Sequence, residues 1–144
     1  MGHCKCLQAA CFFFVLKKGH NTSNIFFCFC SPLSQFLCVD LYHKQLKFFP
    51  GHNENVHAIS FSKDNRLLAS AGADKHVHVF DLTEANVEDS LFLSYQHNKA
   101  VYCVDFHPNG KWVASGSRDK SVLIYDITTG LICHHFLVNF FLKK

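Results

Sequence analysis

Short runs of alternating apolar and polar residues, separated by turn-forming residues, follow one another along residues 51–137. Alternation with a period of two is typical of β-strands, and none of these runs has a helical period. Lys63-Asp64-Asn65 ends the first run, and Ala73-Asp74-Lys75 forms a tight turn between the second and the third. The pattern predicts four short antiparallel strands, at 56–61, 67–71, 76–80 and 91–95.

The same pattern returns 45 residues later without a gap. Residues 52–82 align with residues 97–127, and ten of the 31 aligned positions are identical. In the second copy, His107-Pro108-Asn109-Gly110 supplies a strong turn signal after the first run. Four-stranded units repeated every 40–45 residues are the sequence signature of a propeller blade.

The ends of both copies resemble those of the WD40 repeat, which begins with Gly-His and closes with Trp-Asp. Here Gly51-His52 and Phe80-Asp81 bound the first copy, and Gln96-His97 and Tyr125-Asp126 bound the second. The resemblance covers about residues 36–137 and implies an all-β fold: two four-stranded antiparallel blades of an incomplete β-propeller. It divides the chain into a blade remnant at 36–49, repeats at about 51–95 and 96–137, and non-homologous ends at 1–35 and 138–144.

The resemblance also implies a buried structural hydrogen-bond network in each blade. Its members would be His52, Ser70 and Asp74 in the first blade, and His97, Ser115, Asp119 and Tyr125 in the second. Phe80 stands at the family's Trp position and has no donor, so we expect three members in the first blade. In the second blade a fourth member depends on whether the Tyr125 hydroxyl, which extends farther than an indole N–H, reaches the others.

Serine, histidine and aspartate are also the residues of a hydrolase triad. They recur here at the same offsets in both copies, as a scaffold element would, and the chain has no Gly-x-Ser-x-Gly motif. We therefore expect a structural role, no enzymatic activity and no cofactor.

WD40 propellers are mostly interaction platforms, so the resemblance implies protein or peptide partners. The short apolar runs and the small net charge lead us to expect no membrane and no direct nucleic-acid binding. Other WD40 blades of a longer parent, or self-association, would be further partners, in the cytoplasm or nucleus. Carried over by position, the contact candidates are Asn55, His57, Ala73, Ala100, Tyr102 and Arg118. Tyr102 and Arg118 are the strongest, because tyrosine and arginine dominate interface hot spots.

Composition separates the first 50 residues from the rest. They hold six of the eight cysteines and nine of the sixteen phenylalanines, but only six of the 25 charged residues. An alternative interpretation is a small zinc- or disulfide-stabilised secreted module built on these cysteines, and Asn21-Thr22-Ser23 is a formal glycosylation sequon. Cys4-x-Cys6 and Cys28-x-Cys30 lack the spacing of zinc modules, so we predict no metal site. The net charge of +3 is too small to indicate nucleic acid.

Residues 25–35, IFFCFCSPLSQ, are unusual for a protein but can be encoded by a pyrimidine tract that ends in CAG, as before an exon. Val138-Asn139 can be encoded by the start of an intron. We hypothesise that residues 1–35 and 138–144 are translated intron sequence or disordered, and that the chain is a partial gene product.

Overall fold

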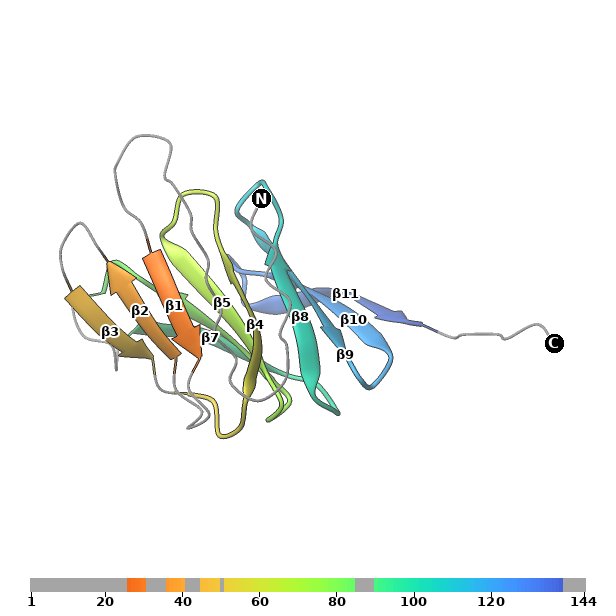
Figure 1. Cartoon of the computed structure of the whole chain (residues 1–144). Coiled ribbons are helices and arrows are strands. Elements are labelled where there is room, and N and C mark those ends of the chain that lie inside the picture. Colours follow the sequence, from red (N-terminus) through yellow and green to blue (C-terminus); the bar gives the residue numbers. More distant parts are fainter. Residues whose placement is uncertain (1–25, 31–35, 41–44, 50, 85–89, 139–144) are drawn as a thin grey trace.

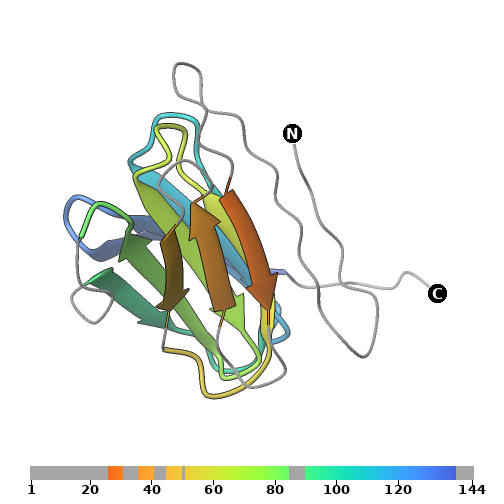
Figure 2. The ribbon, with the colours of Figure 1, turned by 60° about the vertical axis from the view of Figure 1, so that its left-hand side comes forward.

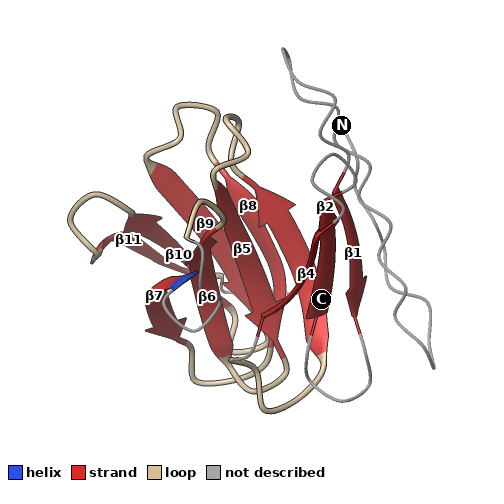
Figure 3. Ribbon diagram, turned by 90° about the vertical axis from the view of Figure 1, so that its left-hand side faces the viewer, coloured by secondary structure: helices blue, strands red, loops and turns tan. Residues whose placement is uncertain are grey.

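A computed structural model describes residues 26–30, 36–40, 45–49, 51–84 and 90–138. They form three antiparallel sheets that lie side by side (Figure 1), with strand orders β1-β2-β3, β4-β5-β6-β7 and β11-β10-β9-β8. A second view shows the same arrangement, with the β1–β3 sheet in front (Figure 2). Ser90, directly before β7, has a helical backbone conformation (Figure 3). No helix in these ranges is long and apolar enough to cross a membrane.

The N-terminal sheet consists of β1 (Phe26–Cys30), β2 (Phe36–Asp40) and β3 (Gln45–Phe49). The first blade consists of β4 (Val56–Phe61), β5 (Leu67–Gly72), β6 (His76–Asp81) and β7 (Leu91–Gln96). The second blade consists of β8 (Val101–Phe106), β9 (Trp112–Ser117), β10 (Ser121–Asp126) and β11 (Leu131–Leu137). The predicted all-β fold with two four-stranded antiparallel blades is confirmed.

The turns repeat as closely as the strands do. Lys75 and Lys120, one period apart, both have positive φ, at 73° and 68°. Asn65 and Gly110 form a second such pair, with φ of 61° and 72°. These residue types occupy the left-handed region at different cost, so the shared conformation is set by the repeat and not by one residue's preference.

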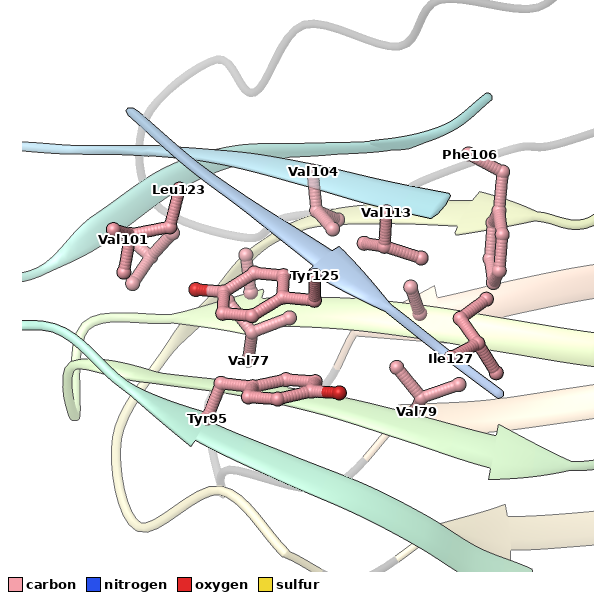
Figure 4. Packing of buried hydrophobic residues seen from close by; sticks show 12 residues of the cluster. Val77, Val79, Tyr95, Val101, Val104, Phe106, Val113, Leu123, Tyr125 and Ile127 are labelled. Atoms are coloured by element: carbon pink, nitrogen blue, oxygen red, sulfur yellow. The ribbon is translucent and has the colours of Figure 1, made fainter. Parts of the chain in front are cut away.

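The main core lies between the two blades, where β8 packs against β4 and β5. Its members from the first blade are Ala69, Ala71, Val77, Val79 and Tyr95, and those from the second are Val101, Val104, Phe106, Val113, Leu123, Tyr125 and Ile127 (Figure 4). The rings of Tyr95 and Tyr125 stack across this interface, with centroids 3.8 Å apart. Each blade therefore buries an apolar face that it could not bury alone.

The opposite face of the first blade is covered at Phe80, whose ring centroid lies 5.1 Å from that of Phe49 at the end of β3. Both side chains are fully buried. The N-terminal sheet contains one strand that the sequence did not predict, because β1 falls within the segment assigned to the non-homologous end. Its sequence, FFCFC, is rich in aromatic residues that favour strands. Residues 1–25, 31–35 and 139–144 lie outside the described part, and a strand at 26–30 does not show how that segment is encoded, so the intron hypothesis stays a prediction.

Candidate functional site

The first blade contains a hydrogen-bond network between the loop before β4, strand β5 and the β5–β6 turn. His52 Nδ1 lies 2.9 Å from Asp74 Oδ1, and His52 Nε2 lies 2.7 Å from Ser70 Oγ. The Asn53 amide donates to Asp74 Oδ2 at 2.9 Å, which fixes the entry loop to the turn. The structure thus brings together the three residues that the resemblance implied. Phe80 adds no donor.

Burial lowers the pKa of His52, although the hydrogen bond that its ring donates to Asp74 opposes this shift. Burial alone would raise the pKa of Asp74, but hydrogen bonds from His52 and the Asn53 amide bring it below its usual value. A neutral imidazole beside a carboxylate fits both shifts. His52 Nδ1–H then donates to Asp74, and His52 Nε2 accepts from the Ser70 hydroxyl.

The second blade repeats the network and extends it. His97 Nε2 lies 2.7 Å from Ser115 Oγ, and His97 Nδ1 lies 3.2 Å from Asp119 Oδ2. The Tyr125 hydroxyl lies 2.8 Å from Ser115 Oγ and 3.2 Å from His97 Nε2. The sequence left open whether this hydroxyl reaches the other residues, and the structure shows that Tyr125 is the fourth member of the second network. Ser121, which the sequence did not indicate, also contacts His97 Nδ1 at 3.0 Å and donates to Asp119.

Burial raises the pKa of Tyr125 to about 12, so its hydroxyl is a stable donor. Burial likewise lowers the pKa of His97. The resulting chain of hydrogen bonds runs from the Tyr125 O–H to Ser115 Oγ, from the Ser115 O–H to His97 Nε2, and from His97 Nδ1–H to Asp119. Every member donates or accepts in a way that its protonation state allows.

The same three residues in each blade also have the contacts of a catalytic triad. A nucleophilic serine must be open to its substrate, however, and Ser70 and Ser115 are 0% and 2% exposed. The histidine side chains are fully buried as well. The networks therefore hold the loops and turns in place, and their serines do not face a substrate in this conformation.

His52, Asp74 and His78 place ligand-type atoms within 4.8 Å of one another. Both nitrogens of His52 and both oxygens of Asp74 already take part in the network, and His78 Nε2 lies 3.0 Å from the Gly51 carbonyl. A metal ion here would have to displace the hydrogen bonds that fix the first blade. The cysteines of residues 1–50 lie outside the side chains that the structure describes.

An open groove of about 560 Å³ lies at the end of the two blades where β4 and β8 begin. Five of the six contact candidates line it: His57, Ala73, Ala100, Tyr102 and Arg118. Asn55, the sixth, is not among the lining residues, although its carbonyl accepts from the Ala73 amide at 2.8 Å. The sequence did not single out Glu54, Lys75, Asn98 and Lys99, which complete the lining. In the sequence each of the four stands within two positions of a predicted contact residue, and this proximity could have indicated them.

Aromatic rings from both blades meet in this groove. His57 and Tyr102, one period apart, have ring centroids separated by 5.0 Å, and Tyr102 is 51% exposed. Burial lowers the pKa of His57, so its imidazole ring is uncharged at neutral pH. The groove thus combines an aromatic pair, in which Tyr102 is exposed and His57 is half-buried, with the charged side chains that line it.

The model of the family described as "WD domain, G-beta repeat" matches residues 43–81 and 90–126, more than half of the chain. A curated relative, "WD repeat-containing protein SL1-17" from Schistosoma mansoni, is 44% identical over 48 residues, which are 33% of this chain and 16% of the relative.

A chain in a crystal structure of a mitotic checkpoint complex superposes with a TM-score of 0.68 at 20% identity. The match covers 84% of this chain and 37% of that one, and at this identity it shows the fold alone. The chain therefore spans less than half of the length of either protein. The repeat period, the blade topology and the family match agree: this chain belongs to the WD40 repeat family.

Proposed function

We propose that the chain is a non-catalytic scaffold that binds a protein or peptide partner in the groove across the two blades. One observation supports this most directly: five positions chosen from the sequence as contact candidates line a single open groove. Tyr102 and Arg118 among them are exposed. These two residue types contribute most often to the binding energy of protein interfaces.

The loops that form the groove are held before any partner arrives. The Arg118 amide donates to the Ala100 carbonyl at 2.9 Å, and the Ser117 hydroxyl lies within hydrogen-bond distance of the Lys99 and Ala100 carbonyls. The Ala73 amide makes the equivalent bond in the first blade. A preorganised surface loses less conformational entropy on binding, which favours a recognition role.

The second blade also supports a place for the chain within a larger propeller. Its face away from the first blade includes half-buried Val122 and Ile124 and 52% exposed Phe136. Further WD40 blades, of a longer parent or of another copy, would cover this face. We place such an assembly in the cytoplasm or nucleus.

The groove assignment is tested by affinity capture with the 144-residue chain and quantification of the retained proteins. Tyr102→Ala and Arg118→Ala should reduce capture of the same partner at unchanged thermal stability, because both side chains are exposed. Phe92→Ala is the matched control, since Phe92 is 49% exposed on β7 and lies outside the groove. Equal capture by all variants, or a loss of stability with affinity intact, would contradict the proposal.

A further inference from the structure

We infer that the groove selects an acidic, extended segment of its partner, whose carboxylates pair with Lys75, Lys99 and Arg118. This inference rests on the proposed function and adds the chemistry of the partner. The three cations line one groove with a single acidic side chain, that of Glu54. The groove therefore has an excess of positive charge, which attracts a carboxylate-bearing segment.

No salt bridge occupies these three cations in the part of the chain that the structure describes. Arg66 shows the contrast: its side chain is 60% exposed, yet its guanidinium lies 2.9 Å from Asp81 Oδ2. The nearby carboxylates of Asp74 and Asp119 face their histidines and backbone amides instead. The groove cations thus remain available for a partner's carboxylates.

The positive charge comes mainly from how the second repeat departs from the first. Lys99 stands one period after Glu54, and Arg118 one period after Ala73. Both changes add positive charge to the part of the groove that the second blade lines. The Arg118 amide donates to the Ala100 carbonyl, so the backbone that carries the guanidinium is held in place.

The His57–Tyr102 ring pair adds an aromatic surface to the groove that the three cations also line. Since the His57 ring is neutral above its lowered pKa, it does not add to the charge at neutral pH. A segment that fits would place acidic residues on both sides of one apolar side chain. Aromatic or aliphatic residues suit the exposed Tyr102 face.

The test uses a short fluorescein-labelled peptide of glutamate and serine around one central phenylalanine, and the same peptide with glutamine in place of glutamate. Fluorescence anisotropy with the 144-residue chain should show binding of the acidic peptide that weakens with salt. Arg118→Ala should raise its Kd about fivefold and Lys75→Gln about threefold. Lys99→Glu, which installs the residue of the first repeat, should raise it about tenfold.

Lys120→Gln is the matched control, because Lys120 stands one period after Lys75, has the same positive φ and lies outside the groove lining. It should change the Kd by less than about 1.5-fold. Equal weakening by all four variants would indicate non-specific attraction and overturn the inference. So would equal binding of the glutamine peptide, no binding of the acidic peptide, or tighter binding of a phosphoserine peptide or an RNA oligonucleotide.

Failure of the inference is distinguishable from failure of the proposed function. If Tyr102→Ala abolishes capture of a partner while acidic and neutral peptides bind alike, the groove binds proteins by other chemistry. If the acidic peptide binds but no groove variant changes partner capture, the proposed function fails and the charge preference remains.

Discussion

The two blades are built on the same 45-residue pattern, yet equivalent faces have different neighbours. In the first blade, Val77 and Val79 are fully buried against the second blade. One period later, Val122 and Ile124 are only half-buried. On the fourth strand, Tyr95 pairs with Val77 and is 9% exposed, whereas Phe136 pairs with Val122 and is 52% exposed. A strand pattern therefore fixes which side chains share a face, and the neighbouring sheet decides whether that face is a core.

The strongest test of this contrast introduces a charge at the same position of each repeat. Val77→Asp places a carboxylate in the core between the blades and should cost about 4 kcal/mol or more of unfolding free energy. Val122→Asp places it on the uncovered face and should cost less than about 1 kcal/mol. Urea denaturation of both variants measures the difference. Equal losses would mean that both faces are covered in solution.

A second difference between the blades concerns acid stability. Burial lowers the pKa of His78 to about 4, and its ring faces His52, His76 and Asp74. In the unfolded chain His78 takes up its proton near pH 6.5, before the folded chain does. The folded state therefore loses no stability to this protonation above pH 6.5 and loses it progressively below. We expect a loss of about 3 kcal/mol as the pH falls from 6.5 to 4.

His78→Leu installs the residue of the second repeat, Leu123, and isolates this effect. Urea denaturation at several pH values between 4 and 7 should show a shallower fall in stability for the variant than for the native chain. A residual slope is expected from His52 and His97, whose pKa values burial also lowers. Identical slopes would assign the acid sensitivity to other groups.

The β5–β6 turn offers a third, smaller contrast. A Cβ on Gly72 would lie 2.4 Å from His52 Nδ1 and 2.6 Å from Asp74 Oδ1, so Gly72→Ala must displace the first-blade network. We expect a loss of about 2 kcal/mol in thermal or urea unfolding. Ser117, one period later, already carries a Cβ, and Ser117→Ala should cost only about 1 kcal/mol for its lost hydrogen bonds. The reverse order would show that the first network adapts to the added methyl group.

Much of this architecture could be predicted from the sequence because the same pattern of strands, turns and marker residues occurs in both repeats. The blade strands follow from the period and its turns, whereas His52 with Ser70 and Asp74, and the five groove residues, follow from the resemblance to the WD40 repeat. Local patterns could not show that the Tyr125 hydroxyl reaches Ser115, because that depends on the packing of the β9–β10 pair. Nor could they show which cations lack a carboxylate partner, since Arg66 meets Asp81 only through the pairing of β5 with β6.

The smallest effect separates two tyrosines that stack on each other. The Tyr125 hydroxyl bonds Ser115 Oγ, so Tyr125→Phe should cost about 1 kcal/mol of unfolding free energy. The Tyr95 hydroxyl is buried without a hydrogen-bond partner among the described residues, so Tyr95→Phe should be neutral or slightly stabilising. Urea denaturation of both variants, with a double-mutant cycle of Tyr125→Phe and Ser115→Ala, assigns the difference to this bond. A coupling energy near zero would mean that the hydroxyl lies beside the second network without supporting it, and that the two blades rest on equivalent three-membered networks.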